Sequence, residues 1–162
     1  MNDEHAGYCP VMGSLRTSPP PPRAVEMRTW ALASGAELRA LRASLHEALT
    51  GHALAEGEEL DDIPERIVLV ATELATNALL HGLPPTTVRL LHDDDLFILD
   101  VADHDLTTVP ELAGTRPLGA GGRGLQLARA FSLDVGWYAT HDTKHIWASF
   151  PRREAGEAGG AR

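Results

Sequence analysis

Residues 63–81 place polar side chains on a helix that otherwise faces a core. Apolar residues recur in this segment at steps of three and four, the spacing that predicts one buried side of a helix. Glu73, Asn77 and His81 stand four residues apart, so their side chains leave adjacent turns on one face. Each buried polar group without a partner costs about 1–3 kcal/mol, so something must satisfy this stripe. A bound ligand is the first candidate.

The residue types in this stripe favour one kind of ligand chemistry. Asn77 offers a neutral oxygen, which suits a hard cation such as Mg²⁺. Glu73, one turn earlier, can hold a water beside the cation or take a proton from an incoming hydroxyl. His81 is expected to pack at the end of the helix, where Gly82 can serve as the C-cap. The spacing of Glu73 and Asn77 alone is common by chance and usually lies on a solvated face.

Two later segments give this helix its context. Residues 97–103 are expected to form a buried strand that ends at Asp103, whose carboxylate either caps a turn or contacts a ligand. Residues 119–125 are rich in glycine and lead into a second helix, expected over 122–131. The free N–H groups and the positive dipole at such a helix start favour a phosphate. Taken alone, however, this segment is an ordinary glycine-rich loop end.

In this order and at these distances, the three segments resemble the N, G1 and G2 boxes of the histidine-kinase-like ATPase superfamily. The run E-L-A-T-N-A-L-L-H-G, the later G-R-G-L and a closing strand with Trp147 and Phe150 look like the anti-sigma-factor serine kinases of actinomycete type. The resemblance covers about residues 25–151. It implies an α+β two-layer sandwich, in which helices cover one face of a mixed, mostly antiparallel sheet.

The resemblance also implies a role for each motif residue. Glu73 would be catalytic, as a general base or as the residue that orients a water. Asn77 would hold Mg²⁺ and thereby the nucleotide, and Asp103 would accept a hydrogen bond from the adenine amino group. The remaining ATP-binding residues would be the four at the second helix start: Gly122, Arg123, Gly124 and Leu125.

The chain departs from the family pattern at two places. The G1 box is normally D-x-G-x-G, but this chain reads Asp103-His-Asp105-Leu-Thr107, and both glycines are missing. Glycine lets the backbone approach a ligand closely, and a carboxylate at 105 repels phosphate unless Mg²⁺ intervenes. In the last strand, His145 stands where the family usually has a threonine that helps the aspartate to hold adenine. We therefore expect adenine recognition to be weaker than magnesium binding.

The rest of the chain is expected to form one domain with two tails. Residues 1–23 contain four prolines at 19–22 and are expected to be a disordered Pro-rich arm. Residues 24–151 would be the ATPase domain and residues 152–162 a flexible tail. Within the domain, strands are expected over 26–33, 88–92, 96–103, 133–140 and 144–151, and a first helix over 37–49. Residues 104–121 lack periodicity, and by the resemblance they would be the nucleotide lid.

Composition narrows the range of partners. A net charge of −9 argues against a nucleic-acid surface, which needs clustered Lys and Arg. The chain has no apolar run of 18 residues and no basic start followed by an apolar segment, so neither membrane insertion nor export is expected. The single cysteine, Cys9, excludes a disulfide framework and a cysteine zinc site. These features fit a cytoplasmic protein.

Two functions follow from these observations. The first is an ATP·Mg²⁺-dependent protein serine/threonine kinase that acts as an anti-sigma factor: it would sequester a sigma factor and phosphorylate a serine on a STAS-type antagonist. The second is a non-catalytic module of the same fold that regulates its partners by docking alone. The missing glycines favour the module, whereas Glu73 and Asn77 favour the kinase. A homodimer is possible in either case.

Overall fold

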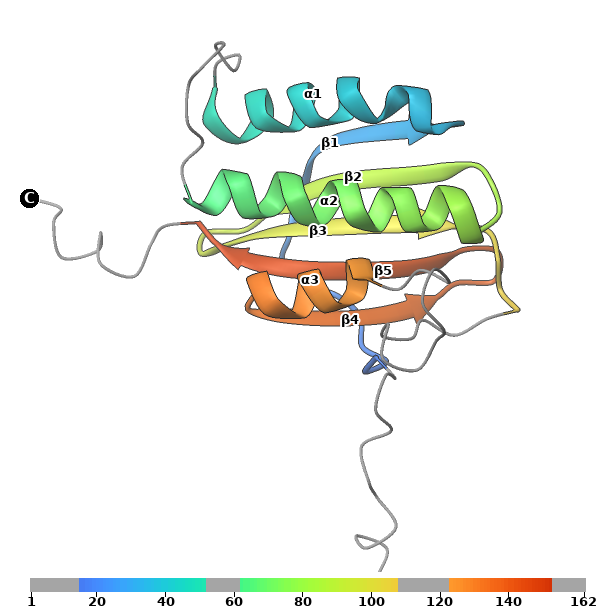
Figure 1. Cartoon of the computed structure of the whole chain (residues 1–162). Coiled ribbons are helices and arrows are strands. Elements are labelled where there is room, and N and C mark those ends of the chain that lie inside the picture. Colours follow the sequence, from blue (N-terminus) through green and yellow to red (C-terminus); the bar gives the residue numbers. More distant parts are fainter. Residues whose placement is uncertain (1–14, 52–61, 108–122, 153–162) are drawn as a thin grey trace, which may run out of the picture.

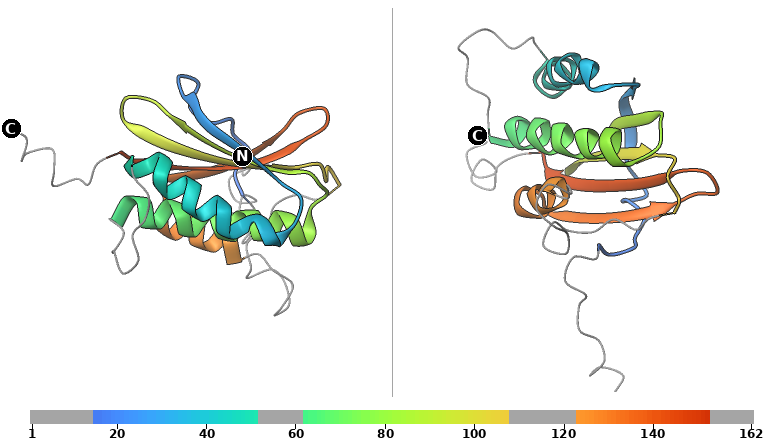
Figure 2. Two further views of the ribbon diagram at one scale, coloured as in Figure 1. Left: turned by 90° about the horizontal axis from the view of Figure 1, so that it is seen from above. Right: turned by 45° about the vertical axis from the view of Figure 1, so that its right-hand side comes forward.

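The computed structural model describes residues 15–51, 62–107 and 123–152. The elements follow in the order β1 (Val25–Leu32), η1 (Gly35–Glu37), α1 (Leu38–Thr50), α2 (Asp62–His81), β2 (Thr86–His92), β3 (Leu96–Asp103), α3 (Arg123–Phe131), β4 (Asp134–Ala139) and β5 (Lys144–Pro151). The strands form a sheet of order β1-β2-β3-β5-β4, and every neighbouring pair is antiparallel (Figure 1). The three α-helices all lie on one face of this sheet (Figure 2). The expected α+β two-layer sandwich is confirmed.

Local signals in the sequence set the ends of several elements. Ser34 and Glu37 form a capping box before α1, in which Ser34 Oγ accepts from the Ala36 N–H over 3.3 Å. The same helix ends at Gly51, whose φ of 85° is a left-handed conformation that glycine adopts without strain. In the β2–β3 turn, the carboxylate of Asp93 accepts from the N–H groups of Asp95 and Leu96. These two backbone hydrogen bonds close the turn, and they also lower the pKa of Asp93.

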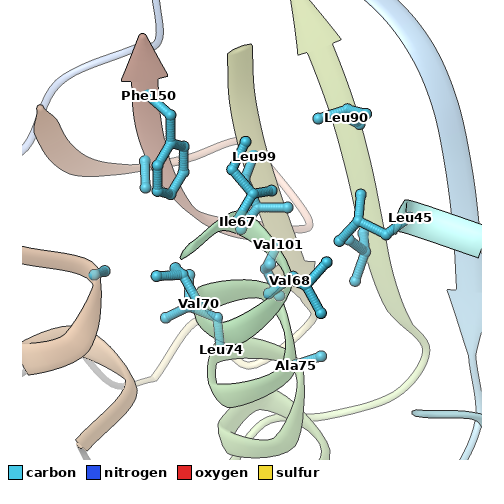
Figure 3. Close-up of a cluster of buried hydrophobic side chains, with 14 of the residues drawn as sticks. Leu45, Ile67, Val68, Val70, Leu74, Ala75, Leu90, Leu99, Val101 and Phe150 are labelled. Atoms are coloured by element: carbon cyan, nitrogen blue, oxygen red, sulfur yellow. The ribbon is translucent and has the colours of Figure 1, made fainter. Parts of the chain in front are cut away.

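The main core lies between α2 and the sheet. Ile67 and Leu74 of α2 are buried against Leu99 of β3 and Phe150 of β5 (Figure 3). Leu45 of α1 extends this core toward β2. Full burial of such a side chain stabilises the fold by about 1.5–3 kcal/mol. Because the helix has to present these side chains to the core, their spacing in residues 63–81 predicted it.

The opposite face of the sheet carries a smaller apolar cluster of Leu91, Ile98 and Trp147. Alternation along the strands produces the two faces, because neighbouring residues of a strand point to opposite sides. In β5, Ile146 packs against the main core whereas Trp147 lies in this outer cluster. The outer face therefore has its own packing, although none of the helices in the described part of the chain covers it.

Residues 15–23 differ from the disordered arm that their composition predicted. Thr17 forms a parallel bridge with Trp137, so this segment lies along the free edge of β4. The indole of Trp137 donates to the Leu15 carbonyl over 3.1 Å, and the indole of Trp147 donates to the Ser18 carbonyl over 2.6 Å. The chain then crosses the outer face to reach β1 at the other edge (Figure 1). Tertiary hydrogen bonds order a segment that has no periodicity of its own.

Two further expectations fall at the margins of the described chain. The lid expected over 104–121 lies mostly outside the described residues, as does the tail after residue 152. Within the described ranges, no helix combines the length and the apolar character needed to cross a membrane.

Candidate functional site

Glu73 and Asn77 lie on the flank of α2 that faces α3. They continue the row of Val70 at steps of three and four residues, so the three side chains share one side of the helix. Figure 3 shows Val70 on the side of α3, whereas Val68 and Ala75 lie on the opposite flank, near Leu45 of α1. The structure thus places both polar residues at the margin of the core, beside α3.

The side chains of Glu73 and Asn77 are half-buried and available to a ligand. Among the described residues, neither side chain has a hydrogen bond or an ion pair. By contrast, the neighbouring hydroxyls of Thr72 and Thr76 both donate to backbone carbonyls of the same helix, at 2.8 Å and 2.7 Å. The two motif residues are therefore the polar groups on this part of α2 that the described fold leaves for another molecule. His81 does not share their surroundings, because it is exposed rather than packed.

Asp103 ends β3 directly beneath the C-terminus of α2. The residue is 6% exposed, and its Oδ1 accepts from the Asp105 N–H over 2.7 Å. A Cβ added to Gly82 would stand 2.5 Å from the Asp103 carboxyl carbon, so only glycine allows this approach. A second bond, from the His104 N–H to the Leu83 carbonyl over 2.9 Å, ties the two segments together.

Gly82 therefore has a different role from the C-cap that the sequence suggested. Among the described glycines only Gly51 has a positive φ, so Gly82 does not end α2 in a left-handed conformation. Its N–H donates to the Ala78 carbonyl over 2.8 Å, which continues the helical hydrogen bonding. The physical reason for glycine at this position is the carboxylate of Asp103, which leaves no room for a side chain.

Lys144, rather than His145, is the β5 residue that faces Asp103. The two residues are partners in the β3–β5 register, and Lys144 Nζ lies 4.0 Å from Asp103 Oδ1 in a buried pair. His145 points to the outer face, where its Nδ1 lies 2.8 Å from Asp100 Oδ1. The expectation that His145 takes the place of the family threonine beside the aspartate is corrected accordingly. The alternation of Lys144 with core residue Ile146 was the signal that could have identified it.

A buried hydroxyl beside this pair also lacks a partner. Thr86 is fully buried, and its Oγ1 has no hydrogen-bond partner within the described part of the chain. Thr87 pairs with Ala102, so Thr86 adjoins Asp103 across the sheet on the helix-covered face. An unpaired buried hydroxyl costs about 1–3 kcal/mol, and a polar ligand edge would remove this cost. The carboxylate, ammonium and hydroxyl together suit the donor and acceptor pattern of a purine.

The segment that lacks the family glycines forms a closed turn. Asp105 is buried, and its Oδ1 accepts from the N–H of Thr107 at 2.9 Å and from the hydroxyl of Thr107 at 2.6 Å. One of its oxygens is thus used within the turn rather than facing a phosphate. Hydrogen bonds to a carboxylate favour its charged form, so the repulsion toward phosphate that the sequence suggested persists unless Mg²⁺ intervenes.

The expected phosphate-binding residues lie at the start of α3. Arg123 and Gly124 are its first two residues, and Gly122 lies outside the described residues. Leu125 is 1% exposed and packs in the main core, so its side chain positions α3 against α2. The contribution of all four residues to nucleotide binding stays a prediction.

A magnesium ion fits this arrangement as a partner of the nucleotide. Among the described residues, no group of three or more His, Cys, Asp or Glu side chains could hold a metal ion. Mg²⁺ is commonly bound through one or two protein oxygens together with substrate phosphates, and the half-buried Asn77 can supply one such oxygen.

Comparison with known proteins agrees with this fold. A solved structure, that of the RsbU and RsbW domains of Rv1364c from Mycobacterium tuberculosis, superposes with a TM-score of 0.51 at 17% sequence identity. The match covers 76% of this chain but 32% of that one, and at this identity the likeness concerns the fold. No curated protein matches the chain. The model of the histidine kinase-like ATPase domain matches residues 31–150, most of the chain, and this match shows that the chain belongs to that family.

Proposed function

We propose that the chain is an ATP-binding anti-sigma factor and protein serine/threonine kinase. In the cytoplasm it would sequester a sigma factor and phosphorylate a serine on a STAS-type antagonist, which then changes partners. The observation that carries this proposal is the pair Glu73 and Asn77, half-buried beside α3 and without a partner among the described residues. The sequence resemblance to anti-sigma-factor serine kinases supports the same function.

In this proposal Glu73 and Asn77 act on the flank of α2 that faces α3. The amide oxygen of Asn77 would hold Mg²⁺, and the ion would supply positive charge that offsets the charge of the triphosphate. Glu73, one turn earlier, accepts the proton of the serine hydroxyl as that oxygen bonds to the γ-phosphorus and the bond from this phosphorus to the leaving ADP breaks. Because Asn77 binds the nucleotide complex and Glu73 acts on the incoming hydroxyl, the two roles are separable by mutation.

The nucleotide base would bind at the other end of the same site. Asp103 accepts a hydrogen bond from the exocyclic amino group of adenine, while Lys144 and the unpaired hydroxyl of Thr86 contact the remaining polar atoms of the ring. Guanine presents a carbonyl where adenine has its amino group, and that carbonyl repels Asp103 but attracts Lys144. The base site therefore prefers ATP, by a smaller margin than a site without lysine would.

A second candidate function is a docking module without phosphotransfer. The closed turn of Asp105 and Thr107 favours it, since this turn occupies the place where the family has flexible glycines. Both candidates bind partner proteins, and they differ in whether a phosphoryl group reaches the antagonist.

The deciding experiment incubates the purified chain with labelled ATP, Mg²⁺, a panel of sigma factors and candidate STAS-type antagonists from the same genome. The kinase proposal expects phosphoserine on one antagonist, and loss of that product in Glu73→Gln. Glu65→Gln is the matched control, because Glu65 is exposed on the same helix and the charge change is identical. Sigma-factor binding without a phosphorylated antagonist would leave only the docking module.

A further inference from the structure

The outer face of the sheet carries a polar cluster that the proposed kinase site does not use. At its centre is Asp100, whose side chain is 1% exposed. His145 Nδ1 lies 2.8 Å from Asp100 Oδ1, and the hydroxyl of Tyr138 donates to Asp100 Oδ2 over 3.1 Å. A guanidinium nitrogen of Arg89 lies 3.4 Å from the same Oδ2. Three strands thus supply one buried carboxylate with three partners.

These partners determine where the proton of His145 lies. Burial, and after it the negative charge of Asp100, raise the pKa of Tyr138 to about 12, so the phenol stays a donor at neutral pH. Arg89 supplies only donors, and an ionised carboxylate only accepts. His145 therefore donates its Nδ1 proton to Asp100, and in the neutral ring the free electron pair lies on Nε2. The ring of Tyr138 stacks on the imidazole, with centroids 4.5 Å apart and planes 8° apart, and fixes its orientation.

Thr143 lies at the free end of this arrangement. Its Oγ1 is 2.9 Å from His145 Nε2, and since Nε2 has no proton in this tautomer, the Thr143 hydroxyl is the donor. Thr140 Oγ1, which is 2.6 Å from Thr143 Oγ1, can donate to it in turn. The N–H of Thr143 donates to Thr140 Oγ1 over 3.0 Å, which holds the two hydroxyls in place. A hydroxyl, a base and an oriented carboxylate in this order have the geometry of an activated nucleophile.

Within the cluster, Thr143 lies nearer to the solvent than the carboxylate of Asp100 does. Thr143 is half-buried in the turn between β4 and β5, and the His145 side chain is 14% exposed. Asp100 lies deeper, where a low dielectric strengthens its interaction with a protonated imidazole. Lys144, between Thr143 and His145, points to the helix-covered face, so the cluster is separate from the nucleotide site.

We propose that Thr143 is an activated nucleophile, and that it is a modification site which accepts a phosphoryl group from a donor with a good leaving group. Thr143 Oγ1 forms a bond to phosphorus as the bond from phosphorus to the leaving group breaks, and the electron pair of that bond departs with the leaving group. The hydroxyl proton passes to His145 Nε2. Asp100 then stabilises the resulting imidazolium, and that proton is afterwards released to water.

The test uses two probes that do not require the nucleotide site, diisopropyl fluorophosphate and acetyl phosphate, with no ATP present. Fluoride and acetate are their respective leaving groups. We expect one added group per chain from either probe, located at Thr143 by peptide mass spectrometry. His145→Gln should lower the labelling rate by about 10²-fold or more, the usual share of a general base. Because ATP is absent, failure here is distinguishable from failure of the proposed kinase function.

Three variants separate a nucleophile from a hydrogen bond that only stabilises the turn. Thr143→Ser keeps the hydroxyl and should keep the label, whereas Thr143→Val should lose it. Tyr138→Phe removes one hydrogen bond from Asp100 but leaves the link to His145, so labelling should continue within a few-fold of the wild type. Absence of label with both probes, or an unchanged labelling rate in a folded His145→Gln variant, would overturn the proposal.

Discussion

Replacement of Gly82 by alanine should disturb the base end of the proposed nucleotide site. The added Cβ would stand 2.5 Å from the Asp103 carboxyl carbon, 2.6 Å from Asp103 Oδ2 and 2.8 Å from the Ala78 carbonyl oxygen. Ordinary contacts of a Cβ are about 3.4–4 Å, so the neighbours must move by roughly 1 Å. A backbone oxygen within a helix moves only at a high cost. The Asp103 side chain can move, but it is buried and hydrogen-bonded to the Asp105 N–H, so its movement is costly too.

The expected cost is that of an overpacked core position, about 1–3 kcal/mol of unfolding free energy. For a domain of this size, each kcal/mol corresponds to about 2–4 °C in melting temperature. The Asp103 side chain shifts at lower cost than the helix backbone, so the variant should also bind ATP more weakly, with the preference for adenine over guanine reduced. Thermal melting and titration calorimetry with ATP and GTP measure the two effects separately.

Gly35→Ala is the matched control for this change. Its added Cβ would meet only the Leu38 side chain, at an ordinary 3.9 Å, and Gly35 has no positive φ. This control should melt within a few degrees of the wild type and bind ATP normally. If Gly82→Ala also melts like the wild type and binds ATP with the same affinity, then the close approach of Gly82 and Asp103 does not shape the site.

Four further predictions test other parts of the molecule. At an ATP concentration of a hundred times Kd, binding should stabilise the wild type by roughly 2.7 kcal/mol. In thermal melts, Asn77→Ala should lose most of the Mg²⁺-dependent part of this stabilisation, whereas the control Thr76→Ala should retain it. Glu73→Gln should lower phosphotransfer by about 10²–10⁴-fold in a labelled-ATP assay while ATP affinity stays within a few-fold; phosphotransfer at the native rate would contradict its role as base. Lys144→Thr should widen the preference for ATP over GTP in calorimetry, and an unchanged ratio would mean that Lys144 does not contact the base. The pKa of Tyr138 is raised to about 12, so the stabilising contribution of its neutral phenol is complete below about pH 10 and is lost as the pH rises through about 12. Ultraviolet titration of the wild type should find one tyrosine that ionises near pH 12, and Tyr138→Phe should lack this transition.

Periodic hydrophobic patterns predicted the regular part of the fold with little error. The helix expected over 63–81 is α2, Asp62–His81, and the strand expected over 26–33 is β1, Val25–Leu32. These segments bury a whole face, so their spacing carries most of the information about their conformation. Residues 15–23 carry no such pattern. Their position depends on two indole N–H groups that lie more than a hundred residues away in the sequence.

The residues of the candidate site likewise divide into those that a local pattern predicts and those that depend on distant contacts. The motif residues Glu73 and Asn77 could be recognised because four-residue spacing on a helix brings side chains together by local geometry alone. Spacing could show only that Lys144 shares the face of Ile146, because Lys144 and Thr86 meet Asp103 through the register of three strands. Register is a non-local property, and a shift of one residue would have exchanged the two faces.

The assignment of residues to the two faces of the sheet explains why the expectation for His145 was wrong. The comparison with the family pattern placed His145 beside Asp103, but the pairing of Asp103 with Lys144 directs the imidazole to the opposite side of the sheet. Asp100 is the corresponding outer-face carboxylate on β3, so each of two adjacent β5 residues faces its own aspartate. The end of this hairpin thus has the Lys144 ammonium at the proposed adenine site on one face and the Thr143 hydroxyl beside the His145 imidazole on the other. A substitution at Lys144 should therefore change nucleotide selection and leave the labelling of Thr143 intact, whereas a substitution at His145 should do the reverse.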